Sequence, residues 1–317
     1  MTFLHERLTE ARERLVAAGI APADAAIDVD LFARTILGWD RARALTARTE
    51  PAPAALEPRL SEWIVRRAER EPSAYIVGNR EFWGLDFRVT SDVLIPRPES
   101  EFIVEESLAI LEKLNIAAPR LADIGTGSGN LAISLLHELP GAHITATDVS
   151  SAALAVARDN ARRHAVEERV TWIETSFLDG ISGPFDLIAA NPPYVKEGDK
   201  PGLARDVRHE PDVALFGGAS GLQGLEAGLD AAVRTLTTPG WLVMEFGFGQ
   251  EDDVWRLVAE RPSLRLDRVR ADLQGIPRTA VIQKLPTSDF QPPASEPQSA
   301  TTTSSAVSGR WRLGVGS

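Results

Sequence analysis

The stretch Leu121-Ala122-Asp123-Ile124-Gly125-Thr126-Gly127-Ser128-Gly129 joins an apolar run of strand length to a glycine-rich loop, and a helical pattern follows over residues 129–138. Glycines at the end of a strand let the backbone turn tightly and approach a ligand without a Cβ in the way. The helix that follows offers free backbone N–H groups. Residues 125–129 are therefore candidate ligand-binding residues, although a plain strand-to-helix turn would also use glycines.

Outward from this loop, apolar runs of strand length alternate with helical stretches. This alternation predicts an α/β domain with a mainly parallel sheet covered on both faces. Ligands of such sheets bind at the carboxyl ends of the strands, near the switch in strand order. The expected strands are 121–124, 143–147, 170–174, 185–190 and 241–246, and the expected helices are 129–138, 150–164, 222–236 and 250–260.

A carboxylate stands at the end of the second expected strand. Asp148 lies 23 residues beyond Gly125. An acid at that distance, at the tip of the next strand, is placed to accept both hydroxyls of a ribose. Alternatively, Asp148 caps the helix that starts at Ser150-Ser151. Together with the glycine loop, Asp148 favours a cofactor that contains a nucleoside.

The most specific motif is Asn191-Pro192-Pro193-Tyr194, directly after the strand 185–190. Two consecutive prolines fix φ and remove two backbone donors, so the segment presents rigid carbonyls. The Asn191 side-chain oxygen and the Pro192 carbonyl can each accept a hydrogen from one planar NH₂ group, and Tyr194 can pack on the face of that group. The alternative is a proline-rich loop that only stops a strand.

Composition excludes several classes of protein. The chain has 317 residues, of which 44% are hydrophobic, so it can bury one or two cores. It has no cysteine, which excludes disulfide scaffolds and thiolate zinc sites. The histidines show no ligand spacing, and no metal site is expected. The charged N-terminus and the lack of a long apolar run predict a cytoplasmic protein without a membrane span.

The net charge of −11 comes from 45 acidic and 34 basic residues. Residues 1–80 hold 12 Arg and 12 Asp or Glu, so the acidic excess lies beyond them. Such a chain lacks the basic surface with which proteins grip duplex phosphates, and no direct contact with nucleic acid is expected. A local patch of arginines is still an alternative, but a solvated helix face gives the same pattern and is the favoured interpretation. Its candidate members are Arg66, Arg67, Arg70 and Arg80.

The chain divides into four parts. Residues 1–75 are predicted to form a small helical domain, broken at proline and glycine. Residues 76–99 form a β-hairpin linker, because aromatic and branched residues surround Gly84. Residues 100–285 hold the α/β domain. The composition then shifts to Ser, Thr, Pro, Ala and Gln, so 286–317 is predicted to be a disordered tail. The helical spacing is clearest in Leu4, Leu8, Ala11 and Leu15.

With these motifs the chain resembles class I S-adenosylmethionine-dependent methyltransferases, and within them the glutamine-N5 methyltransferases of peptide-chain release factors (the HemK/PrmC family). The resemblance spans residues 4–284. The Asn-Pro-Pro-Tyr motif is shared with adenine-N6 methyltransferases, whereas the helical N-terminal domain and the Ile-Pro-Arg-Pro-Glu segment point to the glutamine enzymes. The further matching segments are 72–78, 81–84, Leu94-Ile95-Pro96-Arg97-Pro98-Glu99-Ser100-Glu101, 210–211, 215–218, 221–222, Glu245-Phe246-Gly247, Gln250 and 272–275.

The resemblance implies a Rossmann-like, seven-stranded, mainly parallel sheet and S-adenosylmethionine as cofactor. Residues 125–129, which are Gly125, Thr126, Gly127, Ser128 and Gly129, would meet its methionyl part, and Asn191 would also bind the cofactor. Asp148 would bind its ribose and Phe177 its adenine. Ser176 stands where the family commonly has Asp, which puts a hydrogen bond to the adenine amino group in question.

The resemblance also implies the substrate and the reaction. Residues Asn191, Pro192, Pro193 and Tyr194 would hold the substrate glutamine, with Asn191, Pro192 and Tyr194 as catalytic residues. Methyl would pass directly from the sulfonium to the amide nitrogen of the glutamine in a Gly-Gly-Gln motif. Residues 1–75 would help dock the release factor, and the chain is expected to act as a monomer.

Two other functions stay open. One is an Asn-Pro-Pro-Tyr methyltransferase that acts on a ribosomal-protein glutamine or on adenine in nucleic acid. The latter would be expected to bring a basic groove and a target-reading insert, and neither is found in the sequence. The other is a cofactor-binding interaction module without catalysis, against which the intact motif at 191–194 argues.

Overall fold

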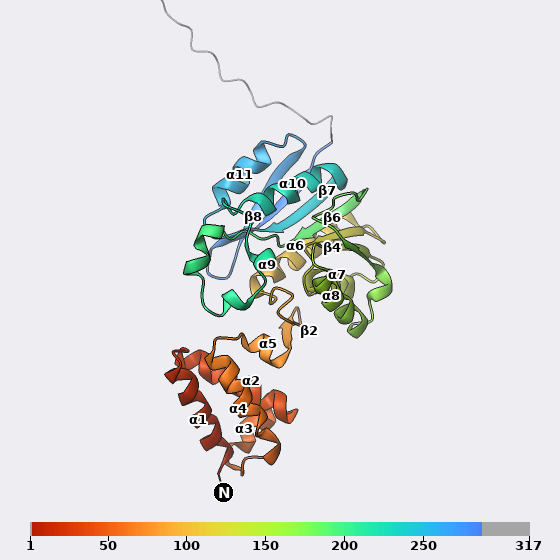
Figure 1. The fold of residues 1–317 in the computed structure, drawn as a ribbon. Helices are drawn as coiled ribbons and strands as arrows, with labels where there is room; N and C mark the ends of the chain where they lie inside the picture. Colours follow the sequence, from red (N-terminus) through yellow and green to blue (C-terminus); the bar gives the residue numbers. More distant parts are fainter. Residues whose placement is uncertain (1, 287–317) are drawn as a thin grey trace, which may run out of the picture.

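The computed structural model describes residues 2–286. The predicted disordered tail lies outside the described residues from position 287 onward. A bundle of helices at the N-terminal end stands beside a larger body of sheet and helices, with a short hairpin between them (Figure 1). No helix between residues 2 and 286 combines the length and apolar character needed to cross a bilayer.

The N-terminal bundle is built on the helical spacing of its apolar residues. Leu4, Leu8 and Leu15 are all buried. Phe32 and Trp63 pack edge to face at 5.4 Å between ring centroids in the same core. The helices are α1 (Leu4–Ala17), α2 (Pro22–Leu37), α3 (Arg41–Thr46), α4 (Arg59–Ala68) and α5 (Ser73–Val77).

A β-hairpin with a two-residue turn follows the bundle. Strands β1 (Asn79–Phe82) and β2 (Leu85–Arg88) pair antiparallel. The turn residues Trp83 and Gly84 have φ of 55° and 70°, the left-handed geometry that suits two-residue hairpins. Phe82 and Phe87 are buried in one cluster with α6 (Glu101–Leu114) and α7 (Asn130–Glu138). The hairpin therefore packs as part of the larger body.

The larger body contains one seven-stranded sheet in the order β5-β4-β3-β6-β7-β9-β8. The first five strands in this order are parallel, and β9 pairs antiparallel with both β7 and β8. The predicted α/β fold with a mainly parallel, seven-stranded sheet is confirmed. The strands are β3 (Arg120–Ile124), β4 (His143–Asp148), β5 (Val170–Glu174), β6 (Phe185–Ala190), β7 (Leu236–Glu245), β8 (Leu264–Ala271) and β9 (Pro277–Lys284).

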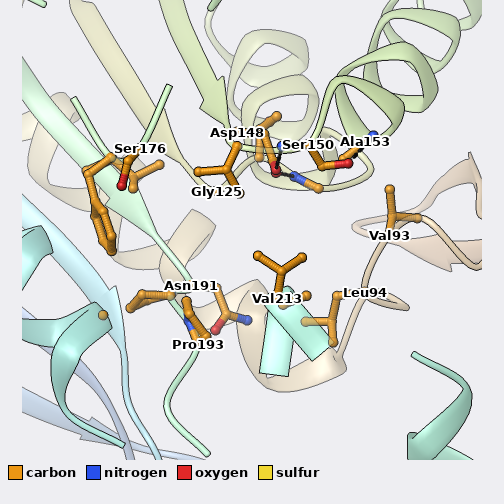
Figure 2. A pocket seen from close by; sticks show the side chains of 18 of the residues that line it. Val93, Leu94, Gly125, Asp148, Ser150, Ala153, Ser176, Asn191, Pro193 and Val213 are labelled. Carbon is orange, nitrogen blue, oxygen red and sulfur yellow. Dashed lines mark hydrogen bonds between the residues drawn. The ribbon is translucent and has the colours of Figure 1, made fainter. Parts of the chain in front are cut away.

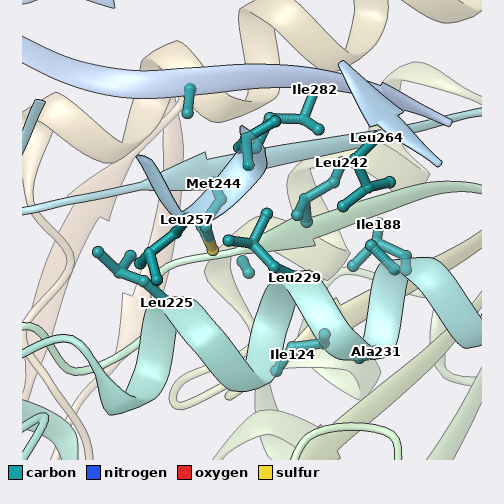
Figure 3. Packing of buried hydrophobic residues seen from close by; sticks show 14 of the residues in the cluster. Ile124, Ile188, Leu225, Leu229, Ala231, Leu242, Met244, Leu257, Leu264 and Ile282 are labelled. Atoms are coloured by element: carbon teal, nitrogen blue, oxygen red, sulfur yellow. The ribbon is translucent and has the colours of Figure 1, made fainter. Parts of the chain in front are cut away.

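Helices cover both faces of the sheet, because the buried strands carry apolar side chains on each side. Leu121 belongs to the cluster with α6, α7 and α8 (Ser151–Arg163), whereas Ala122 belongs to the cluster with α10 (Gln223–Thr235) and α11 (Glu251–Ala259). Figure 3 shows Leu225 and Leu229 of α10 directed at Leu242 and Met244 of β7. Short elements complete the fold: α9 (Asp212–Leu215) and 3-10 turns at Ala47–Thr49, Ala54–Leu56, Pro98–Ser100, Glu167–Arg169, Glu197–Gly202 and Val207–His209.

The strand order of the sheet reverses at β3. From β3 the chain proceeds through β4 to β5 on one side, and then returns to β6 on the other side of β3. The loops after β3 and β6 therefore leave the same edge in opposite directions, which opens a crevice between them. The glycine loop and the Asn-Pro-Pro-Tyr segment are these two loops.

Candidate active site

A cavity of about 530 Å³ lies at this edge of the sheet. Gly125 and Asp148 stand on one side of it, and Asn191 and Pro193 on the opposite side (Figure 2). Ser176 lies toward one end of the view. The volume is in the range of pockets that bind small ligands and cofactors. The fold thus brings predicted residues from the ends of four separate strands to one cavity.

The glycines of the first loop have two different roles. Gly125 and Gly127 line the cavity with φ of +67° and +54°. A Cβ at Gly125 would meet nothing within 4 Å, so open space lies beside the backbone there. A Cβ at Gly129 would lie 3.0 Å from Ile133 Cδ1 and 3.2 Å from Ala157 Cβ. Gly129 does not line the cavity, and its role is to let α7 pack closely against α8.

Thr126 and Ser128 also line the cavity, but their side chains are buried. The Thr126 hydroxyl donates to Asp123 Oδ2 at 2.6 Å. Burial raises the pKa of Asp123 to about 7. The Ser128 carbonyl accepts a hydrogen bond from buried Asn160 Nδ2 at 2.8 Å. These side chains and partners fix the course of the loop.

Asp148 holds the glycine loop and the start of α8 together. Its Oδ2 accepts the Gly127 N–H at 3.0 Å, and its Oδ1 accepts the Ser150 N–H at 2.9 Å. The N-cap of α8 is Ser150, whose Oγ accepts the Ala153 N–H at 3.1 Å. Burial raises the pKa of Asp148, and its backbone hydrogen bonds partly offset that effect. Each carboxylate oxygen keeps a further lone pair for a ligand hydroxyl.

Phe177 and Ser176 follow β5 and line the cavity. Phe177 has a φ of +50° and packs against the hydrophobic cluster of α10 and α11. A positive φ is unusual for an aromatic residue and directs the chain sharply at this point. Ser176 is exposed, in the place where the resembling family commonly carries Asp.

The Asn-Pro-Pro-Tyr segment puts three of its residues on the cavity wall. Asn191 Nδ2 donates to Ser100 Oγ at 2.9 Å. Within residues 2–286, no donor reaches Asn191 Oδ1 or the Pro192 carbonyl. Both oxygens can therefore accept a ligand N–H. Tyr194 is not on the wall, and its hydroxyl donates to Glu245 Oε1 at 3.0 Å.

Sequence reasoning gave no role to Ser100 and Glu245. Both are buried, and Ser100 Oγ donates to Glu245 Oε2 at 2.6 Å. A signal was present in the sequence, because a carboxylate that ends an apolar strand at the ligand-binding edge is a candidate functional group. The cavity is also lined by Val93, Leu94, Pro96, Arg97, Val213 and Phe216, which come from the segment before α6 and from the region around α9.

Three of the four arginines in the candidate patch make contacts inside the chain. Arg67 is buried and pairs with Asp28 at 2.6 Å and with Asp206 at 2.8 Å. Arg66 pairs with a carboxylate of its own domain, and Arg70 donates to a backbone carbonyl. These three side chains therefore hold the helical domain together and tie it to the loop that carries Asp206.

Two family models match the chain. Residues 6–78 match the PrmC N-terminal domain, and residues 105–210 match the methyltransferase small domain. A methyltransferase of this fold takes its methyl group from S-adenosylmethionine. The cavity fits that cofactor, because it offers glycine backbone without steric obstruction, an aromatic ring, and a carboxylate at a strand end.

The chain is also similar to known methyltransferases in sequence and in fold. The release factor glutamine methyltransferase of Bradyrhizobium diazoefficiens is 38% identical over 283 residues, which cover 87% of this chain and 95% of the relative. That of Moorella thermoacetica is 40% identical over 278 residues, covering 86% and 95%. The crystal structure of the hMettl16 catalytic domain in complex with MAT2A 3'UTR hairpin 6 shares the fold, with a TM-score of 0.54, 16% identity, and coverage of 71% of this chain and 84% of that one. The chain belongs to the release factor glutamine methyltransferase family.

Proposed function

We propose that this protein methylates the side-chain amide nitrogen of the glutamine in the Gly-Gly-Gln motif of a peptide-chain release factor. The observation that carries the proposal is the pair of acceptors, Asn191 Oδ1 and the Pro192 carbonyl, on the wall of a cavity that fits S-adenosylmethionine. A primary carboxamide has two N–H hydrogens in one plane, so two fixed acceptors can hold it in one orientation.

The cofactor end of the cavity is assigned to the side of Gly125 and Asp148. The open space beside Gly125 accommodates the methionyl part, and the carboxylate of Asp148 accepts the ribose hydroxyls. Phe177 contacts the adenine ring, while Ser176 offers a hydroxyl in place of a carboxylate near it. Gly129 supports this arrangement through helix packing and makes no ligand contact.

The substrate end is assigned to Asn191 and Pro192, with Pro193 beside them on the wall. When bound, S-adenosylmethionine supplies a methyl group on a positively charged sulfur, which a nucleophile in line with the carbon–sulfur bond can displace. An amide nitrogen is a weak nucleophile, because its lone pair is delocalised into the carbonyl. Acceptors at both N–H bonds push electron density onto the nitrogen and fix its line of attack. As the nitrogen formed its bond to the methyl carbon, the carbon–sulfur bond would break and leave a neutral thioether, and the nitrogen would then release one proton to water.

The test is Asn191→Ala, assayed by transfer of radiolabelled methyl to a release factor. We expect kcat to fall roughly 10²-fold or more, the usual scale for loss of one preorganised polar group. A release factor whose Gly-Gly-Gln glutamine is replaced by alanine serves as the control and should accept no label. Normal turnover by Asn191→Ala at saturating substrates would refute the proposed role of the acceptor pair.

The same assay separates the alternatives. A release factor, a ribosomal protein with an accessible glutamine, and DNA are offered side by side. Label in the ribosomal protein or in DNA alone would overturn the proposed substrate, and cofactor binding without label in any of them would indicate an interaction module. We further propose that residues 1–75 contact the release factor and that the protein acts as a monomer in the cytoplasm without direct contact to nucleic acid.

A further inference from the structure

Two buried side chains, Ser100 and Glu245, connect Asn191 to Tyr194 behind the cavity wall. Asn191 Nδ2 donates to Ser100 Oγ (2.9 Å), and Ser100 Oγ donates to Glu245 Oε2 (2.6 Å). The Tyr194 hydroxyl donates to Glu245 Oε1 (3.0 Å). Ser100 is 1% exposed and Glu245 is 2% exposed. The four side chains thus form one hydrogen-bonded chain that ends at the residue proposed to hold the substrate.

Ser100 occupies a position where its hydroxyl would ordinarily serve its own helix. It is the N-cap of α6, and a serine there usually accepts a backbone N–H from the first turn. In this protein the Ser100 side chain makes no capping bond. Its oxygen accepts from Asn191 and its hydrogen goes to Glu245. The Ser100 hydroxyl is therefore available for these two contacts.

The number of hydrogens fixes the direction of every bond in this chain. A hydroxyl has one hydrogen to donate, and an ionised carboxylate can only accept. Because the Ser100 hydrogen goes to Glu245, Ser100 can only accept from its other neighbour. Asn191 must then present its NH₂ group to Ser100. Its Oδ1 is left for the cavity, where the substrate amide needs an acceptor.

We propose that Ser100 and Glu245 are positioning residues that set the orientation of the Asn191 amide, so that its oxygen meets the substrate glutamine. This inference rests on the proposed function of Asn191 as an acceptor. Without Ser100 and Glu245, no side chain would hold the Asn191 amide in this orientation. A turned or misaligned amide no longer presents a fixed acceptor to the N–H groups of the substrate, and turnover would fall.

Protonation of Glu245 on Oε2, the oxygen that does not accept from Tyr194, reverses the chain. The new O–H then donates to Ser100, and the Ser100 hydrogen turns toward Asn191. Asn191 must then accept this hydrogen with Oδ1. Its NH₂ group is left facing the NH₂ group of the substrate. Turnover therefore requires the ionised form and is lost as the pH falls through the pKa of Glu245.

The surroundings of Glu245 raise its pKa, so turnover should be lost at a higher pH than an exposed glutamate would give. Burial raises the pKa of Glu245, the hydrogen bonds from Ser100 and Tyr194 lower it, nearby Glu99 raises it, and nearby Arg278 lowers it, with a net rise. Burial also raises the pKa of Tyr194, so its hydroxyl remains a donor. The acidic side of the pH profile should therefore report the titration of Glu245.

Two variants test the inference in the full chain. Ser100→Ala removes the link, and Glu245→Gln keeps the shape but puts a donor where two acceptors are needed. We expect kcat to fall roughly 10- to 100-fold in each, the scale found when residues that orient a site residue are replaced. Affinity for S-adenosylmethionine should not change. Ser107→Ala is the matched control, because Ser107 lies on the same helix, is fully buried, and has no partner for its hydroxyl within the described chain. It should keep full activity.

The pH profile of kcat at saturating substrates separates positioning from a purely structural role. The wild type should lose activity toward acid, whereas the residual activity of Glu245→Gln should not follow that titration, because an amide does not ionise. Normal kcat in Ser100→Ala and Glu245→Gln, with Asn191→Ala inactive, would overturn only this inference. Loss of S-adenosylmethionine binding in both variants would also overturn it, as a structural role. An active Asn191→Ala would instead refute the proposed function.

Discussion

At the scale of single residues, each polar side chain of the cavity uses some of its hydrogen-bonding capacity to hold its own position and keeps the rest for a ligand. Asp148 is fixed by two backbone N–H groups, from Gly127 and Ser150, and keeps lone pairs on both oxygens. Asn191 is fixed through its nitrogen and keeps its oxygen. A ligand therefore meets groups whose orientation has already been set, which lowers the entropy lost on binding.

Asp148→Ala should weaken the binding of S-adenosylmethionine by about 1.5–3 kcal/mol, the usual scale for hydrogen bonds to a charged acceptor. The physical reason is the loss of the two contacts that we propose between Asp148 and the ribose hydroxyls. Calorimetric titration of the full chain measures the effect. Thermal unfolding is followed in parallel, since Asp148 also holds Gly127 and Ser150. Unchanged affinity with a lower melting temperature would mean that Asp148 only holds the loop.

Sequence reasoning gave roles to Asp148 and Asn191 at strand ends, but it missed Glu245 at the end of β7 and Ser100, which comes from another part of the chain. Asp148 is the last residue of β4 and Asn191 directly follows β6, at the edge where parallel sheets bind ligands. Ser100 lies 91 residues from Asn191 and 145 residues from Glu245, and one sequence carries no sign that these positions meet. Tyr194 was expected on the cavity wall, but the Glu245 carboxylate holds its hydroxyl behind it.

At the scale of elements, the loop between β3 and α7 combines binding with packing. Gly125 and Gly127 face the cavity, whereas Gly129 lies against Ile133 and Ala157. All three glycines have positive φ, but only the third is crowded. Substitution at this third glycine should therefore act on helix packing first and on the cofactor only as a consequence.

Gly129→Ala should lower the free energy of unfolding by about 2–4 kcal/mol, because left-handed strain adds to overpacking between α7 and α8. Urea denaturation measures the effect. Gly249→Ala is the matched control, since Gly249 has a φ of +77° with nothing within 4 Å of a built Cβ. It should lose only about 1–2 kcal/mol from strain. Equal losses in the two variants would contradict the packing role of Gly129.

The secondary structure was predicted best where apolar runs were unbroken. All five expected strands are present, but β7 begins at Leu236, five residues before the expected position 241, because Pro239 and Gly240 interrupt its apolar pattern. Strand β8 was not predicted, since it is an edge strand rich in arginine. Two of these arginines, Arg268 and Arg270, pair with buried Glu106 of α6. Such cross-element pairs cannot be read from periodicity.

At the scale of the whole molecule, the helical domain is tied to one wall of the cavity. Arg67 joins Asp28 of its own domain to Asp206, which lies in the segment between β6 and α9. The same segment leads to Val213 on the cavity wall. Further along it, Glu210 accepts the Ile95 N–H at 3.1 Å and so fixes the segment before α6, which also lines the cavity. The position of residues 1–75 is thus linked to the substrate end.

This link predicts that Asp206→Asn raises the KM for the release factor by roughly 3- to 10-fold, which corresponds to one net hydrogen bond. A release factor held by residues 1–75 and by the cavity gains from a fixed distance between them, and a loosened link raises the entropy lost on binding. Steady-state kinetics with intact release factor measures KM. Affinity for S-adenosylmethionine should not change, because Asp206 does not line the cavity.

Two substrates and a control variant from the same segment test whether the ion pair of Arg67 with Asp206 positions the helical domain for the release factor. A short peptide with the Gly-Gly-Gln motif cannot reach the helical domain, so its KM should be equal in Asp206→Asn and the wild type. Asp199→Asn removes the same charge from an exposed position that has no ion pair within the described chain, and it should leave both substrates unaffected. If Asp206→Asn raises the KM of the peptide as much as that of the intact release factor, the effect arises at the cavity wall itself. The ion pair of Arg67 with Asp206 would then have no part in placing the helical domain for its substrate.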